Sequence, residues 1–475
     1  MSAGRAVVVG AGPNGLVAAI ELAREGVDVT LLEAADVIGG GIRSRPLTAP
    51  GFVHDVCASV FPMGVGSPAM RGLPLAEHGL RWVHPALPLA HPLDGGRAVS
   101  MSRSLARTAA GLGRDGDAYR RLVGPVARRW WDFARDALGP PRLPRSPLLL
   151  ARFAWSGVRP AASVASDSFR TEEARALFAG CGAHSFLQLE RGPSAAFALV
   201  LLAAGHAVGW PFAEGGAQRL ADALAAILRA YGGVIRTGAP VRSLAELPDA
   251  DAVLLDLAPA QLLEMAGDRL PRPYARALAS YDYGPAVFKL DWALAAPIPW
   301  AAPACRRAGT VHVGGTLEDI AEAERAPWEG RAADRPFVLL AQPSLFDPTR
   351  APDDRHTAWA YCHVPAYHPG DMTEAVERQI ERFAPGFRDR ILARSARGPA
   401  DLERDNPSYV GGHVVGGVPT YRQLLTRPTL SLSPYETPLE GVFLCSQYTP
   451  PGGGAHGMCG FHAARAALRR FARAG

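Results

Sequence analysis

The chain has 475 residues, 48% hydrophobic and 20% charged, with a net charge of +5. This length predicts at least two domains, and the composition is that of an ordinary globular protein. The cations are scattered among 45 acidic residues without a run of five or more, which argues against a nucleic-acid-binding surface.

The first element is a short apolar strand at residues 6–9, followed by Gly10, Gly12 and Gly15 in the spacing G-x-G-x-x-G. Residues 16–24 then show helical spacing. A glycine allows the tight turn, a second allows a pyrophosphate to approach the backbone, and a third allows the helix to pack on the strand. The helix N-terminus presents free N–H groups to phosphate. This motif predicts dinucleotide binding.

The second strand is expected at residues 27–33 and ends in Glu33, which can accept hydrogen bonds from ribose hydroxyls. Glu33 argues against a 2′-phosphate and therefore favours FAD or NAD over NADP. A second glycine-rich turn at residues 39–41 and Arg43 suit a flavin dinucleotide, whose pyrophosphate Arg43 can neutralise. We therefore expect FAD, with these residues of the N-terminal segment at the cofactor: Gly10, Gly12, Pro13, Asn14, Gly15, Glu33, Ala34, Gly40, Gly41 and Arg43.

Two long segments interrupt the dinucleotide domain. The first is expected to be largely helical, and its apolar stretch at 194–210 predicts a buried helix or part of a channel lining. The second contains strand-like runs, which predict an antiparallel sheet over the cofactor. We expect an FAD-binding domain formed by 1–69, 211–284 and 406–475, and a substrate domain formed by 70–210 and 285–405.

The C-terminal segment predicts a strand at 442–445, a glycine-rich loop and a helix beginning near Gly457. The helix N-terminus would present N–H groups to the ribityl or pyrimidine end of the flavin. Gly454, His456, Gly457 and Met458 are therefore predicted cofactor residues. For His456 the alternative is a loop histidine that bonds to the local backbone.

The chain resembles the bacterial-type phytoene desaturase and carotenoid isomerase group of FAD oxidoreductases. Within it, the chain most resembles the branch named pyridine nucleotide-disulphide oxidoreductase domain-containing protein 2. The resemblance rests on segments along nearly the whole chain, among them GFVHDVCASVFPM, GHAVGWPFAEGGAQRLADAL, YGPAVFKLDWAL and PPGGGAHGMCGFHAARAA. It implies a fold of the glutathione-reductase and amine-oxidase type, that is, α/β with a Rossmann-like FAD-binding domain and a discontinuous α+β substrate domain. It also implies that the backbone of Val241 contacts the adenine, and that Asp55 follows the turn that leads to the isoalloxazine.

The chain contains six cysteines but no C-x-x-C pair, and no second dinucleotide motif follows a strand. Dithiol chemistry and stable NAD(P)H binding are therefore not expected, despite the name of the branch. His184, His312 and His363 are scattered without metal-ligand spacing, so we predict no metal.

Lys289 is the only lysine, since the other 49 of the 50 Lys and Arg residues are arginines. Strand alternation places Lys289 and Asp291 on one face. One interpretation is a structural ion pair between them. The other is a catalytic role, in which the Lys289 ammonium reaches the flavin, by analogy with amine-oxidase-like flavoenzymes.

We predict an FAD-dependent oxidoreductase that desaturates or isomerises an apolar, polyene-like or isoprenoid-like substrate by hydride transfer. A flavin amine or amino-acid oxidase and a flavin-bearing interaction module are the alternatives. The early first strand leaves no room for a signal peptide, and no segment reaches the length of a membrane span, so a cytoplasmic protein is expected. Peripheral membrane contact through the stretch SPLLLARFAW is an alternative to packing of that helix into the core.

Overall fold

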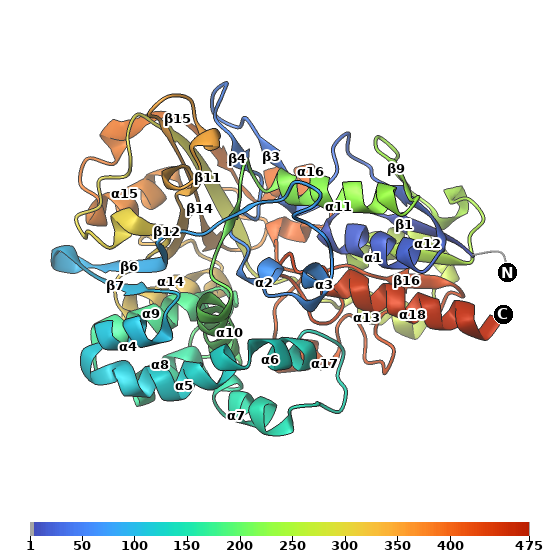
Figure 1. Cartoon of the computed structure of the whole chain (residues 1–475), viewed down its shortest axis with the longest axis horizontal. Coiled ribbons are helices and arrows are strands. Elements are labelled where there is room, and N and C mark those ends of the chain that lie inside the picture. Colours follow the sequence, from blue (N-terminus) through green and yellow to red (C-terminus); the bar gives the residue numbers. More distant parts are fainter. Residues whose placement is uncertain (1–3, 475) are drawn as a thin grey trace.

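A five-stranded parallel sheet forms around the first glycine-rich motif in the computed structural model, which describes residues 4–474 (Figure 1). Its strand order places β1 between β10 and β2, which brings together segments from both ends of the chain. The strands in spatial order are β16 (Val442–Leu444), β10 (Ala252–Leu255), β1 (Arg5–Val9), β2 (Asp28–Leu32) and β9 (Val234–Arg236).

Helices cover both faces of this sheet, as the continuous apolar pattern of β1 requires. Ala6 and Val8 pack toward one layer of helices, and Val7 and Val9 pack toward the other. In Figure 1 the first and last helices, α1 and α18, lie side by side. The covering helices are α1 (Pro13–Arg24), α11 (Gln218–Ala230) and α18 (Met458–Ala474) on one face, and α12 (Pro259–Ala266) and α13 (Arg272–Ala279) on the other.

A second, seven-stranded sheet takes its strands from both interrupting segments. Its pairs are antiparallel except that β6 pairs with β12 in parallel, so the predicted antiparallel sheet is correct but for that pair. The helix α15 (Thr373–Phe383) packs on one face. The strands in spatial order are β15 (Ile391–Arg397), β11 (Ala286–Leu294), β14 (His356–Val364), β13 (Val338–Ala341), β12 (Ala308–Val313), β6 (Leu87–Leu93) and β7 (Arg97–Met101).

A helical layer built from the first interrupting segment lies below the second sheet in Figure 1. The apolar helix α10 runs through its centre and packs on α5, α7 and α9. The predicted apolar helix at 194–210 is therefore confirmed. The layer consists of α4 (Leu105–Gly111), α5 (Gly116–Arg128), α6 (Trp130–Ala137), α7 (Pro147–Gly157), α8 (Ala161–Ser168), α9 (Glu172–Ala183) and α10 (Ser194–Ala207).

The SPLLLARFAW helix packs on the core through one side only, where Leu149, Leu150 and Phe153 contact it. This stretch forms most of α7, but Leu148 and Trp155 keep 85% and 80% of their surface exposed, while Leu149 is buried. No helix among residues 4–474 is long and apolar enough to cross a membrane.

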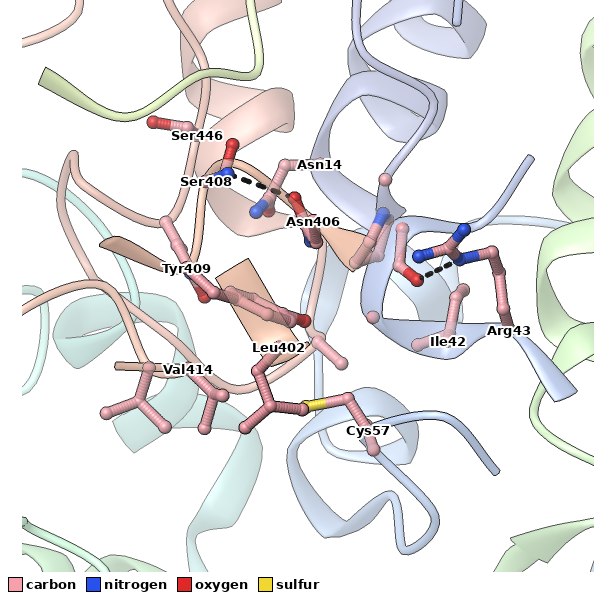
Figure 2. Close-up of a pocket in the computed structure, with 18 of the residues that line it drawn as sticks. Asn14, Ile42, Arg43, Cys57, Leu402, Asn406, Ser408, Tyr409, Val414 and Ser446 are labelled. Carbon is pink, nitrogen blue, oxygen red and sulfur yellow. Dashed lines mark hydrogen bonds between the residues drawn. The ribbon is translucent and has the colours of Figure 1, made fainter. Parts of the chain in front are cut away.

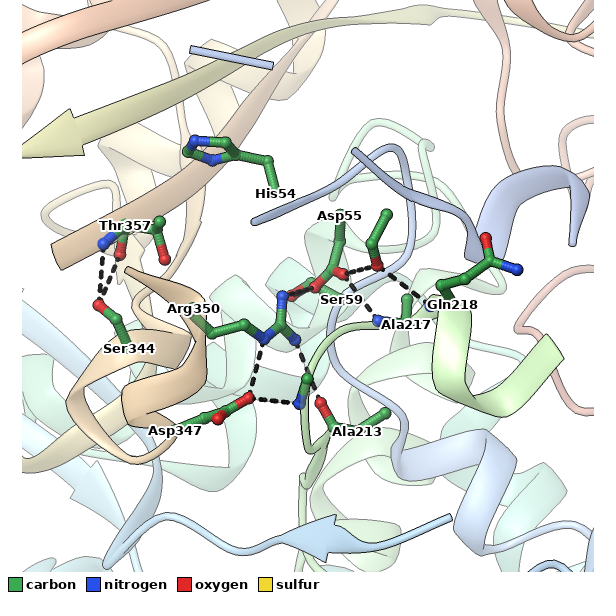
Figure 3. A network of polar contacts seen from close by, with 12 residues as sticks. His54, Asp55, Ser59, Ala213, Ala217, Gln218, Ser344, Asp347, Arg350 and Thr357 are labelled. Carbon is green, nitrogen blue, oxygen red and sulfur yellow. Dashed lines mark hydrogen bonds and ion pairs between the residues drawn. The ribbon is translucent and has the colours of Figure 1, made fainter. Parts of the chain in front are cut away.

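A buried ion network fixes the strand β4 (His54–Asp55) to the second interrupting segment (Figure 3). Arg350 donates to Asp55 at 3.0 Å and to Asp347 at 2.9 Å, and all three side chains are buried. Asp55 also accepts from the hydroxyl of Ser59 at 2.6 Å. Asp55, for which the resemblance implied a place near the cofactor, thus holds the chain that leads to it.

Candidate active site

One cavity of about 520 Å³ runs from the glycine-rich motif of the parallel sheet to the inner face of the second sheet. Glycine-rich segments line one end, and apolar and aromatic side chains from β11, β13 and β14 line the other. The cavity therefore joins a dinucleotide-binding end to a second, mostly apolar end.

The turn between β1 and α1 is tightly packed. A Cβ atom on Gly15 would lie 1.9 Å from the carbonyl oxygen of Gly10, so helix and strand can approach this closely only without a side chain. Gly10, Gly12 and Asn14 line the cavity, whereas Gly15 packs behind it. This is the division of roles predicted from the spacing.

Asp256, at the end of β10, lies directly behind this turn. One carboxylate oxygen accepts the N–H of Gly15 at 3.0 Å, and a Cβ on Gly12 would lie 2.7 Å from the same oxygen. Burial raises the pKa of Asp256 to about 7, an effect that the Gly15 N–H opposes. The sequence predicted a strand ending at the ligand here, but not the carboxyl group.

The carboxylate of Glu33 accepts the N–H of Ala11 at 2.7 Å and that of Ala35 at 2.9 Å, and it lines the cavity. These bonds fix the carboxylate while its remaining lone pairs stay available to a ribose. Ala34 and Val241 line the same end. The residues predicted for the adenosine half thus lie together.

The second glycine-rich segment lies against the first. The N–H of Gly39 donates to Ala11 at 2.8 Å, and a Cβ on Gly40 would lie 3.2 Å from the Cα of Gly12. Gly40, Gly41 and Arg43 line the cavity. Both turns therefore face the same end of the cavity.

Arg43 has a partner that the sequence did not reveal. Its buried guanidinium donates to the carbonyl of Gly40 at 2.8 Å and to the carboxylate of Asp405 at 3.0 Å. Arg45 also pairs with Asp405, at 2.8 Å. Neutralisation of a pyrophosphate by Arg43 remains a prediction, since Asp405 already balances part of its charge.

The C-terminal glycine-rich loop has two parts. Gly454 lines the cavity, with a φ of +135° that favours glycine. His456, Gly457 and Met458 do not belong to the lining. The buried ring of His456 accepts the N–H of Met458 at 3.1 Å, as in the alternative of a loop histidine bonding to the local backbone.

Tyr409 lies in the middle of the cavity, surrounded by Cys57, Leu402 and Val414 (Figure 2). Tyr409 and Cys57 pack in one buried cluster. Burial raises the pKa of both groups. Both side chains are therefore neutral near pH 7 and form an uncharged wall.

Lys289 lines the far end of the cavity from β11. Its buried ammonium pairs with Asp291 and lies 5.5 Å from the centre of the Trp359 ring. Burial lowers the pKa of Lys289 to about 8, against the opposing effect of Asp291. The two interpretations of this lysine are thus compatible in geometry, because the ion pair and the cavity share one face of the strand.

Two of the three histidines described as scattered are in contact. The Nε2 atoms of His184 and His312 are 3.0 Å apart, and His184 lines the cavity. His91 lies beyond His312 and hydrogen-bonds to the carbonyl of Gly315 at 2.6 Å. Burial lowers the pKa of His184 to about 3 and that of His91 to about 4, so the group is neutral. Residues 4–474 contain no group of three His, Cys, Asp or Glu side chains placed to hold a metal.

Two predictions touch the far end of the cavity: Leu201 and Trp210 come from the stretch 194–210 predicted as a buried helix or channel lining, and other lining residues come from the predicted sheet. The individual lining residues could not be found from the sequence. The walls of this end come from elements widely separated in the chain, and none of them carries a local motif. The lining residues that the sequence did not indicate as a group are His184, Leu201, Trp210, Thr310, Leu339, Trp359, Tyr361, Leu402, Tyr409 and Val415.

The residues present fit a dinucleotide with a flavin. At the α1 end, the buried Oδ1 of Asn14 has no hydrogen-bond partner within the described chain, and no side chain caps the helix. Asn14 and Gly12 would hold the phosphates, Glu33 the ribose, and the segment around Tyr409 and Ser446 would flank the flavin.

Comparisons with known proteins agree with this geometry. The family model described as flavin containing amine oxidoreductase matches residues 14–467. The mouse pyridine nucleotide-disulfide oxidoreductase domain-containing protein 2 is 26% identical over 98% of this chain and 93% of its own length. A hydroxyneurosporene desaturase from Cereibacter sphaeroides is 30% identical over half of each chain.

Solved structures show the same fold. An oxidoreductase from Methanosarcina mazei covers 98% of this chain and 100% of its own, with a TM-score of 0.64 and 17% identity. Putrescine oxidase bound to putrescine covers 99% of both chains, with a TM-score of 0.63 and 17% identity. With a family match over almost its whole length and a cavity built for a flavin dinucleotide, the chain belongs to the flavin-containing amine oxidoreductase family and its cofactor is FAD.

Proposed function

We propose that the protein removes a hydride from an apolar, polyene-like or isoprenoid-like substrate, in a desaturation or a redox-dependent isomerisation. The proposal rests on the mostly apolar lining of the far end of the cavity. Leu201, Leu339 and Val415 line it, and its charged group is a lysine. Bound FAD supplies the hydride acceptor.

The acidic side chains that line the cavity lie outside its far, apolar end. Glu33 and Asp256 belong to the dinucleotide end, and Asp405 is balanced by Arg43 and Arg45. A cationic amine would therefore meet the Lys289 ammonium without a carboxylate free to bind it. The apolar walls would orient an extended substrate and exclude water.

Amine oxidation is the second candidate, and one contact favours it. The rings of Trp359 and Tyr361 stand almost perpendicular, with centroids 5.3 Å apart, which is a geometry suited to holding an amine. The fold shared with putrescine oxidase agrees with this candidate. Against it, the Lys289 ammonium already lies near the Trp359 ring.

Anaerobic titration of the purified holoenzyme separates the candidates. Polyenes presented in detergent micelles are expected to bleach the visible absorbance of FAD, while primary amines and diamines leave it unchanged. Bleaching by amines alone would support the oxidase. A flavin that neither class reduces would contradict both and favour an interaction module.

A further inference from the structure

An exposed apolar and basic face lies at the lower edge of the molecule in Figure 1. It consists of the loop 139–146, α7, α17 (Tyr421–Leu425) and the loop 426–434, and is called the α7/α17 face below. Large apolar side chains protrude from all four elements, with these exposed fractions: Leu143 94%, Leu148 85%, Trp155 80%, Leu425 66%, Leu430 81% and Leu432 104%.

The four elements form one surface. The hydroxyl of Tyr421, at the start of α17, donates to the carbonyl of Val158, directly after α7. At the other side, the ring of Tyr435, directly after the loop 426–434, stacks on His462. The His462 ring is hydrogen-bonded to the carbonyl of Leu138, directly before the loop 139–146, at 3.1 Å. Side chains far apart in the sequence therefore protrude from a continuous face.

The charge of this face has one sign. Residues 142–160 and 416–435 contain six arginines and neither Asp nor Glu. Arg159 pairs with Asp167, and Arg427 is buried against backbone carbonyls. The other four are exposed and form no ion pair within residues 4–474: Arg142, Arg145, Arg152 and Arg422.

We propose that the α7/α17 face docks on an anionic lipid bilayer. Protruding leucines and a tryptophan can enter the headgroup region while the arginines bind lipid phosphates. A second copy fits less well, because a two-fold contact would bring four unpaired arginines opposite four others. Neutral lipid would leave the arginines without a counter-charge.

The face also lies close to the apolar end of the cavity. The helix α10 packs on α7, and its Leu201 lines the cavity. In the chain, Val414 and Val415 line the cavity shortly before α17 begins. A docked molecule would therefore hold this end of the cavity near the membrane. Docking itself does not depend on the proposed reaction.

Flotation of the FAD-loaded full chain with vesicles tests the proposal. The protein is expected to float with vesicles of phosphatidylcholine containing about 30% phosphatidylglycerol, and not with phosphatidylcholine alone. Added salt should reduce the bound fraction. The variant R142Q/R145Q/R152Q/R422Q should weaken binding about fivefold for each arginine removed. The variant L148S/W155S/L430S/L432S should abolish it.

The matched control is R81Q/R229Q/R269Q/R272Q, which removes the same charge from exposed positions outside the face. It should float like the parent, and every variant should retain its FAD content and circular dichroism. A parent that does not float with anionic vesicles, or variants of the face that float no less than the control, would overturn the proposal. Light scattering would then assign the face to a second copy if the serine variant dissociates a dimer, and otherwise to a protein partner.

Discussion

The ammonium of Lys289 is buried between a carboxylate, an indole ring and the cavity. With a pKa lowered by burial to about 8, it can hold or release a proton near neutral pH. An arginine cannot do so, because it keeps its proton at every accessible pH. This difference is a physical reason for a lysine at this position in a chain that otherwise uses arginine.

Lys289→Met is expected to slow reduction or reoxidation of the bound flavin by at least about tenfold, because it removes the proton-holding group. Stopped-flow absorbance across pH 6–9.5 measures both rates, and the parent should show a transition near pH 8 that the variant lacks. Lys289→Arg keeps the charge and should lose the transition. Unchanged rates in Lys289→Met would contradict a catalytic role and leave the ion pair with Asp291 as the role of Lys289.

The buried histidines predict acid sensitivity. Burial depresses the folded-state pKa of His91 to about 4, below its ordinary 6.5, so the unfolded chain takes up a proton first. Stability should therefore fall as the pH falls from about 6.5 to about 4, by about 1.4 kcal/mol per pH unit for each such histidine.

His91→Gln should reduce the dependence of stability on pH by the contribution of one histidine, about 1.4 kcal/mol per pH unit. Urea unfolding at several pH values measures it, with His78→Gln, a half-exposed position outside the cluster, as the control. An unchanged slope in His91→Gln would contradict a neutral, buried His91.

At the scale of elements, the turn between β1 and α1 depends on one missing side chain. Gly15→Ala would place a methyl group 1.9 Å from the carbonyl oxygen of Gly10, so helix and strand must separate. We expect most of the bound FAD to be lost on purification, measured as the ratio of flavin to protein absorbance. Gly111→Ala is the control, since nothing lies within 4 Å of its Cβ. Equal FAD content in both variants would contradict the role of Gly15.

The ion network at β4 supports the wall of the cavity. Arg350→Met would leave Asp55 and Asp347 buried without their cation, at a cost of about 3–5 kcal/mol. Arg378→Met, which removes an exposed pair with Glu374, should cost less than about 0.5 kcal/mol. Urea unfolding compares the two. Similar losses in both variants would show that the buried network contributes little.

For the whole molecule, the cavity lies between two sheets, so its ligand should stabilise both. FAD at about 100 times its Kd should raise the free energy of unfolding by about 2.7 kcal/mol. Urea unfolding of protein stripped of cofactor, with FAD or NAD added, measures the effect. Hydrogen exchange should slow in β1 and in β11 together. Equal stabilisation by NAD would contradict selectivity for the flavin dinucleotide.

The predicted division into two domains stays a prediction, although the strands fall into the two sheets as expected. The parallel sheet takes β1, β2, β9, β10 and β16 from the three FAD-domain segments, and the second sheet takes all its strands from the other two. The alternation of β11 was readable in advance: Val287 and Lys289 face the cavity, while Phe288 and Leu290 enter the core. The alternation of side chains along a strand is a local property, so it can be predicted without knowledge of the fold.

The dinucleotide end could be predicted in advance, because its turn, helix, second strand and terminal acid all lie in one continuous stretch with fixed spacing. Four other features depend on tertiary contacts: the residues at the far end of the cavity, the pairing of Arg43 with Asp405, the contact of His184 with His312 and the exposure of one side of α7. Each of these depends on which distant segments fold against one another. An apolar helix pattern shows that a face can be buried, but only the neighbouring elements decide whether anything covers it.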